Sequence, residues 1–399
     1  MSVETAGPTR AQQATPLPLP GEDHQPLGLR AGAFIVYPSV ETGIELTDNV
    51  FQSSQNERDD RGYFVAPALR IESDWVRHSL RVNAGSRHLY YFGNPSEDEL
   101  EVDVRVDGRI DIKRTTRLEV EAAYNLDQEG RGRVDVPGAA AEPPNEHRLN
   151  GEARIVHQAG RFEVQVGGNA EYNLYEDVDL VGGGSQNNSD RNFTEVGGTL
   201  RVGYDVSPRI QPFVAGGYSA QIYDQRIDDN GLRRDSDGYE VEAGVRVELS
   251  PALSGELAIG YVRREFDDPA LSAVDGVTVD GLLEWRPSEI TTVALNVSTD
   301  IDETGAGTSS GALERIVGIS INHALRENLL LAASAQYSFE DFTGSSLTEE
   351  TVFLTAGLTY QLNRSVAIRA GYSYEEFDSS TAGSDYVENR ILVSLLLQQ

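Results

Sequence analysis

The sequence contains no cysteine among its 399 residues. This absence excludes disulfide bonds, thiolate metal sites and cysteine nucleophiles. Positive charge is also scarce, since 33 Lys and Arg residues stand against 64 Asp and Glu residues and Lys113 is the single lysine. A net charge of −31 argues against a nucleic-acid partner, because binding to a duplex depends on clustered positive charge.

Long apolar runs are absent too. No stretch of about 18 apolar residues occurs, so a transmembrane helix is excluded. A membrane-spanning strand needs only about 9–11 residues, of which half face lipid, so the mean hydropathy of −0.38 is compatible with spanning strands. Residues 1–30 lack an apolar core and are not a secretory signal peptide. We predict that the Pro-rich residues 1–32 form a disordered periplasmic tail.

What the sequence does contain is an alternation with a period of two that starts at Ala33. Between Phe162 and Leu174, the even-numbered residues are apolar or small and include Tyr172, whereas the odd-numbered residues are almost all polar. This period indicates strands rather than helices. We predict about 18 strands, with 16 as the alternative count. The predicted spans are 33–47, 62–73, 78–91, 99–113, 117–127, 147–158, 161–176, 191–205, 209–224, 237–249, 254–266, 273–286, 290–302, 311–324, 328–340, 349–362, 365–378 and 386–398.

The connections between these strands alternate between short turns and longer acidic loops, of which 128–146 is the longest. That pattern is typical of outer-membrane barrels, whose short turns lie on the periplasmic side. We therefore predict an all-β fold in which residues 33–399 form a closed antiparallel transmembrane β-barrel. Closure follows because an open sheet edge is not tolerated in hydrocarbon.

Aromatic residues on the apolar face fall into two groups by height. Near the long-loop ends of the strands are Tyr90, Tyr124, Tyr172, Tyr218, Tyr261, Tyr337 and Tyr372, and near the short-turn ends are Phe162, Tyr204, Trp285 and Tyr360. Two girdles of aromatic rings match the two membrane–water interfaces. The apolar face is therefore expected to meet lipid, and the polar face an aqueous lumen.

The predicted lumen carries charges of both signs. The candidate lumen-lining residues are Arg81, Arg87, Arg105, Arg109, Glu119, Glu121, Glu163, Glu171, Arg201 and Arg369. They could form a charged constriction that selects solutes, or they could pair across strands and support the register. Tyr37, Tyr91 and Tyr175 could likewise be platforms for sugars or caps near the rims of the lumen.

No motif in the sequence points to catalysis. The six histidines fall in no recognisable catalytic or zinc motif, so we expect no enzymatic activity, no cofactor and no metal site. The stretch DIDETGAG from Asp300 loosely resembles a calcium loop, but it lacks the full ligand spacing, so a solvated loop is expected. The acidic outer loops could bridge divalent cations at a lipopolysaccharide surface.

The stretch YPSVETGIELTDNVFQSS, which starts at Tyr37, resembles the start of the bacterial putative β-barrel porin-2 family. The matching pieces are the Pro-Ser-Val opening, Gly43 inside the strand and the exit from Thr47 to Phe51, and the alternation extends the resemblance over residues 33–399. The resemblance implies an outer-membrane protein of Gram-negative bacteria that is in many cases associated with exopolysaccharide export.

These observations predict a pore in the cell outer membrane. The expected function is a conduit for exopolysaccharide export, with a small-solute diffusion porin and a non-conducting surface adhesion or anchoring barrel as the alternatives. A soluble β protein is a further alternative, but no repeat longer than a hairpin supports it. The expected partners are outer-membrane lipid, lipopolysaccharide and a periplasmic polysaccharide-export protein, and no nucleic acid.

Overall fold

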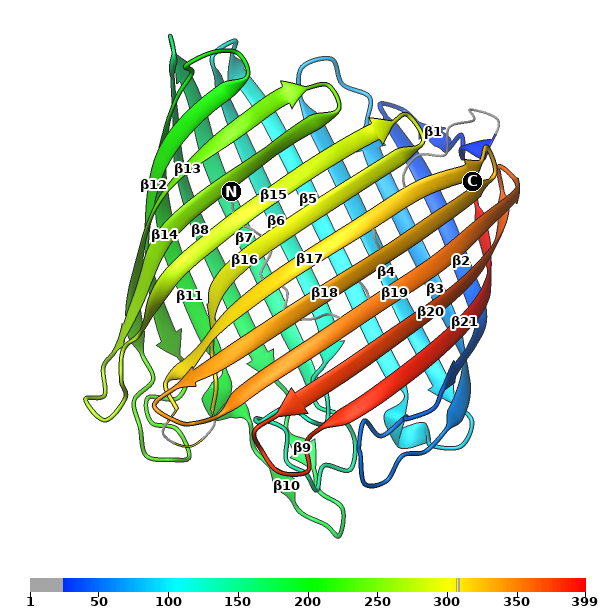
Figure 1. Cartoon of the computed structure of the whole chain (residues 1–399), viewed down its shortest axis with the longest axis vertical. Coiled ribbons are helices and arrows are strands. Elements are labelled where there is room, and N and C mark those ends of the chain that lie inside the picture. Colours follow the sequence, from blue (N-terminus) through cyan, green and yellow to red (C-terminus); the bar gives the residue numbers. More distant parts are fainter. Residues whose placement is uncertain (1–23, 306, 308) are drawn as a thin grey trace.

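A computed structural model describes residues 24–305, 307 and 309–399 of the chain, which form a single closed β-barrel (Figure 1). In this part of the chain, eighteen strands make the wall, and each is antiparallel to its neighbours. The ring closes where β21 pairs with β2, from Ser39 opposite Gln398 to Thr47 opposite Arg390. The predicted fold is confirmed.

The wall strands are 12 to 16 residues long, enough to cross a bilayer core at a tilt. They are β2 (Phe34–Thr47), β3 (Asp60–Ser73), β4 (Ser79–Tyr91), β5 (Glu99–Lys113), β6 (Thr116–Gln128), β7 (Asn145–Ala159), β8 (Phe162–Tyr175), β11 (Phe193–Tyr204), β12 (Ile210–Tyr223), β13 (Ser236–Ser250), β14 (Leu253–Phe266), β15 (Val274–Ser288), β16 (Thr291–Asp302), β17 (Gly311–Arg326), β18 (Leu329–Thr343), β19 (Thr348–Asn363), β20 (Val366–Ser379) and β21 (Tyr386–Gln398).

The described residues also form short elements that are not among the eighteen wall strands. They include β1 (Leu29–Ala31), the hairpin of β9 (Val178–Asp179) and β10 (Ser185–Gln186), and the single helical turns η2 (Pro95–Glu97) and η3 (Ser189–Arg191). Among the described residues, no helix has the length and apolarity to cross a membrane.

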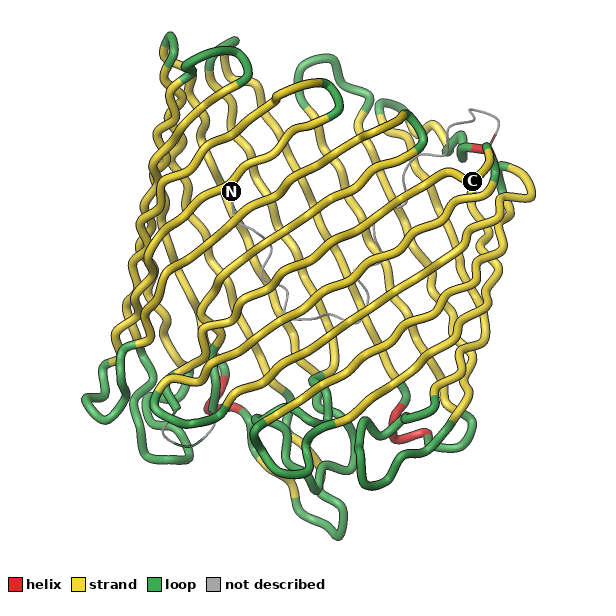
Figure 2. Tube along the Cα trace, viewed as in Figure 1, coloured by secondary structure: helices red, strands yellow, loops and turns green. Residues whose placement is uncertain are grey.

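The two ends of the barrel differ in their connections (Figure 2). Tight turns join the strands at the upper end of the view, where the chain also finishes, and the longer loops gather at the lower end together with the helical turns η2 and η3. We call the lower end the outer mouth. The sequence analysis placed residues 29–31 in the tail, but they pair with β2, Leu29 lying opposite Val36, and so belong to the sheet. Residues 1–23 of the predicted tail lie outside the described residues.

The two faces of each strand meet different surroundings. On β8, Val166 points outward and is 55% exposed, whereas Glu163 faces inward and is 9% exposed. The same sorting holds on other strands, where Ile44 and Val214 are exposed outward and Glu41 is buried inside. The outer wall therefore carries the apolar band that a bilayer requires, and the lumen carries the polar side chains.

Candidate functional site

The cations predicted to line the lumen are all held by carboxylates on the barrel wall. Arg105 pairs with Glu121 at 2.8 Å, so two of the predicted residues meet each other. Arg201 binds the Glu256 carboxylate through both terminal nitrogens, at 2.6 and 2.7 Å. The others pair as follows: Arg81 with Glu72, Arg87 with Glu45 and Glu99, Arg109 with Asp111, and Arg369 with Glu41.

The remaining predicted acids also have partners along or across strands. Glu119 pairs with Arg117 at 2.6 Å, and Glu163 accepts a hydrogen bond of 2.8 Å from Gln165. Glu171 accepts one of 2.7 Å from Asn173 and lies 3.8 Å from Arg148. The first three contacts lie within one strand, and the approach of Arg148 on β7 to Glu171 on β8 joins neighbouring strands and supports their register. A role of the same residues in solute selection stays a prediction.

The predicted girdle residues lie on the outer face. Tyr172, Tyr218, Tyr261 and Tyr337 each donate a hydroxyl hydrogen bond to a carboxylate nearer the outer mouth, at 2.6 to 2.9 Å. Tyr372 donates to Asn389, Tyr124 contacts His147, and Tyr90 stacks on Tyr63. At the other end, Tyr204 packs on Phe162, and Trp285 and Tyr360 are exposed. Rings with an apolar body and a hydrogen-bonded polar tip suit a membrane interface.

Residues 129–144, between β6 and β7, cross the outer mouth, and we call them the mouth loop. Near its own side of the barrel, Arg131 binds Glu97 of η2 through two nitrogens, at 2.6 and 2.7 Å. Arg133 reaches Glu340 of β18 at 2.5 Å and Glu349 of β19 at 3.3 Å. In the strand order, β18 lies almost half the ring away from β6, so the mouth loop bridges opposite walls.

A second loop packs on the mouth loop. The hairpin of β9 and β10 follows β8, and its Val178 is buried against Val136 and Ala140 of the mouth loop. Backbone hydrogen bonds join the two loops, from the Ala141 N–H to the Asp179 carbonyl and from the Val181 N–H to the Ala139 carbonyl, at 2.7 and 2.9 Å. The two loops together form one cover over part of the mouth.

The loop after β16 completes this cover and corrects one prediction. The stretch expected to be a solvated loop instead packs inward, where Thr304 is 1% exposed. Its hydroxyl and the Gly305 N–H both donate to Asp135 of the mouth loop, at 3.0 Å. The expectation failed because the partner, Asp135, lies 169 residues away in the sequence.

Buried charges at the mouth have shifted proton affinities. Burial raises the pKa of Glu303 to about 7, against the opposing effect of Arg191. Burial also raises the pKa of Glu129, although Arg191 donates two hydrogen bonds to it, at 2.8 and 2.9 Å. Burial of Arg133 is outweighed by the carboxylates of Glu340 and Glu349, so the Arg133 pKa lies well above its usual range. The cover is therefore held by ion pairs in a poorly solvated setting.

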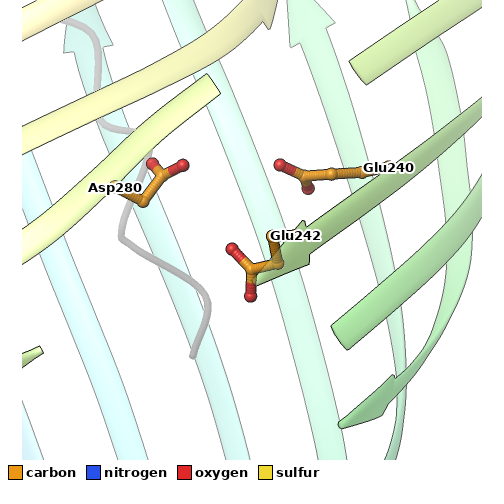
Figure 3. A group of neighbouring side chains, drawn as sticks. All are labelled: Glu240, Glu242 and Asp280. Carbon is orange, nitrogen blue, oxygen red and sulfur yellow. The ribbon is translucent and has the colours of Figure 1, made fainter. Parts of the chain in front are cut away.

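Among the described residues, one group on the lumen wall has ligands suited to a metal ion. Glu240, Glu242 and Asp280 place carboxylate oxygens within 4.8 Å of one another, and the three side chains converge in Figure 3. The sequence analysis expected no metal site and missed this group. The alternation on β13 shows that both glutamates face the lumen, but nothing local shows that Asp280 lies beside them.

The sequence analysis also missed the residues of the mouth, Arg131, Arg133, Asp135 and Arg191. A signal was available, since Arg131 and Arg133 alternate with glycines inside a long connection of a chain that is poor in cations. Arginines in such a loop are expected to pair with some of the many carboxylates of the barrel, although the sequence does not say which ones.

A closed barrel with an apolar outer band and a polar lumen defines a class of protein, an outer-membrane β-barrel porin. The chain belongs to the putative beta-barrel porin 2 family, whose sequence model matches residues 22–399. No curated protein matches the chain in sequence.

Two of the solved structures with a similar fold are proteins of Pseudomonas aeruginosa. OccK2 (OpdF), solved in complex with glucuronate, is 11% identical with a TM-score of 0.45, over 92% of this chain and 98% of that one. The ferric enterobactin receptor PfeA is 6% identical with a TM-score of 0.45, over 91% of this chain and 80% of that one.

Proposed function

We propose that this porin is a passive channel for small water-soluble solutes, and that the mouth loop limits the size of what passes. The observation that carries the proposal is the bridge from the mouth loop to the opposite wall through Arg133, Glu340 and Glu349. Barrels of about 16–18 strands enclose an aqueous channel, so a loop across the opening is the feature that narrows it.

The same geometry gives less support to the export of exopolysaccharide, which remains the alternative. A polymer needs a continuous open path, and aromatic platforms need exposed ring faces. Tyr91 and Tyr175 are buried at the mouth, 4% and 6% exposed, and Arg191 lies 3.8 Å above the Tyr175 ring. Tyr37 lies toward the other end of β2, beneath Arg70. These rings favour the capping interpretation over a sugar track.

The test is conductance of the purified porin in planar bilayers, with swelling of proteoliposomes in sugars of increasing size. We expect a stable small conductance and a sharp size limit. Replacing residues 132–142 by a short Gly-Ser linker should raise both the conductance and the size limit. A wild-type barrel that stays closed until a periplasmic export protein is added would instead support the polysaccharide conduit.

In this role the outer apolar band contacts membrane lipid, the outer rim contacts lipopolysaccharide, and the barrel catalyses no reaction. The support is the row of tyrosines bonded to carboxylates at the height of the head groups, such as Tyr172 with Asp224. Reconstitution with and without lipopolysaccharide, followed by heat-modifiable migration on a gel, tests whether that lipid stabilises the barrel.

A further inference from the structure

Most charges on the lumen wall are paired, but one stretch of wall is an exception. Between β13 and β17, six inward-facing carboxylates have no Arg, Lys or His nitrogen within 4.0 Å among the described residues. They are Glu240, Glu242, Asp280, Asp300, Asp302 and Glu314. Carboxylates packed this closely repel one another unless a cation or a proton neutralises them.

Three of these acids converge on one point. Glu240 and Glu242 lie two residues apart on the same face of β13, and Asp280 lies on β15 (Figure 3). Their oxygens lie within 4.8 Å of one another. The backbone N–H of Thr299 donates to Asp280 at 3.3 Å, which fixes the direction of that carboxylate.

The intervening strand β14 leaves room for the convergence. Gly260 of β14 lies opposite both Glu242 and Thr278 in the sheet register. A Cβ at Gly260 would lie 2.6 Å from the Thr278 hydroxyl and 3.0 Å from the Glu242 Cβ, so a side chain there would displace both. Glycine therefore forms the floor on which the side chains of β13 and β15 approach each other.

The hydroxyl of Thr278 is a separate observation that points to a ligand. Thr278 is 1% exposed, and its hydroxyl oxygen leans over Gly260 toward the glutamates. The hydroxyl is directed at the Glu240 carboxylate, but this approach does not reach hydrogen-bond distance and angle, and no other partner in the described part of the chain does so. A buried polar group without a partner is costly, and a bound cation would use its lone pairs.

We propose that Glu240, Glu242, Asp280 and Thr278 bind a calcium ion on the lumen wall. All four ligands are oxygens, which hard divalent cations prefer. Ca²⁺ takes six to eight oxygen ligands in flexible geometry, whereas Mg²⁺ needs a near-ideal octahedron and keeps several waters, so three carboxylates and a hydroxyl on one wall suit Ca²⁺ better. The ion ties β13 to β15 across β14, and its binding does not depend on which solute the channel carries.

The test is isothermal titration calorimetry of the full barrel, refolded in detergent without lipopolysaccharide and freed of metal with a chelator. We expect wild-type protein to bind one equivalent of Ca²⁺ and Asp280→Asn to bind it at least tenfold more weakly. Asp103→Asn is the matched control, because it removes one lumen-facing carboxylate from β5 on another part of the wall. It should bind Ca²⁺ like the wild type.

Heat-modifiable migration shows whether each variant has folded, and Glu242→Gln replaces Asp280→Asn if the latter fails. Equal Ca²⁺ affinity of the wild type, Asp280→Asn and Asp103→Asn overturns the site, because calcium then associates with other acidic groups. Absence of a calcium isotherm in the wild type overturns it as well. Equal affinity for Mg²⁺ overturns the assignment to calcium.

Discussion

Replacement of Arg133 by alanine tests the idea that ion pairs hold the mouth loop across the barrel. A guanidinium nitrogen of Arg133 lies 2.5 Å from Glu340 and 3.3 Å from Glu349, and the guanidinium carbon is 5.4 Å from the centre of the Phe377 ring. The side chains of Glu340 and Glu349 are 4% and 1% exposed, so removing the cation leaves two carboxylates without their main partner.

The size of the effect follows from burial. Breaking a fully buried ion pair costs about 3–5 kcal/mol. The Arg133 side chain is 23% exposed at a water-filled mouth, so screening reduces this figure. A loss of about 2 kcal/mol from the closed arrangement corresponds to roughly a thirtyfold change in the ratio of closed to open mouth.

The assay is single-channel recording of the wild type, Arg133→Ala and the control Arg117→Ala. Arg117 pairs with Glu119 on the wall, at the short-turn end of β6, which is the end away from the mouth loop. We expect more frequent and longer high-conductance states only for Arg133→Ala. Adding Glu340→Gln to Arg133→Ala should change little further, because the pair is already broken. Identical recordings for wild type and Arg133→Ala would refute the reasoning.

Three further predictions concern the wall, the mouth and the field in the lumen. Val166 lies about halfway between the girdle rings of β8, and Val166→Arg should lower the free energy of unfolding by about 2–4 kcal/mol in urea unfolding from vesicles. The control Asn169→Arg, which faces the lumen, should lower it much less. Equal losses of stability would contradict the assignment of the two faces. Because burial raises the pKa of Glu303 to about 7, ionising it costs more in the closed mouth than in water, so closure should weaken from about pH 4.5 to 7 and then level off. Recordings of Glu303→Gln should lack this dependence, and an unchanged pH profile would contradict the cause. In a KCl gradient the reversal potential should be that of a cation-selective channel; a chloride-selective potential would contradict the unpaired acids as its source.

The wall of the barrel could be predicted from the sequence because the rule that builds it is local. Each strand must expose one face to lipid and one to water, so apolar and polar residues alternate along each strand, as between Phe162 and Leu174. The face of the girdle follows from the same alternation, and its height follows from the strand ends, since Tyr172 and Tyr218 both lie in the last few residues of β8 and β12 before a long loop.

The mouth and the convergent acids could not be predicted, because their contacts are not local. Arg133 and Glu340 are 207 residues apart, and no spacing rule links a loop to the opposite side of a ring. The β9–β10 hairpin was missed because each of its strands has only two residues, too few for any periodicity. Asp280 reaches Glu240 only through the register of three strands.

The number of charged residues in the lumen does not by itself determine the electric field there. A charge that is paired with an opposite charge contributes little to the field at a distance, whereas an unpaired charge contributes fully. Arg201 and Glu256 lie 2.6 Å apart and nearly cancel for a solute in the channel. Asp300 and Glu314 have no cation at ion-pair distance in the described part of the chain, and their field extends into the water until salt screens it, over about 8 Å at physiological ionic strength. The arginines of the lumen therefore act mainly on the register of the wall, whereas the acids of β13–β17 act on an entering ion wherever no proton or bound cation neutralises them.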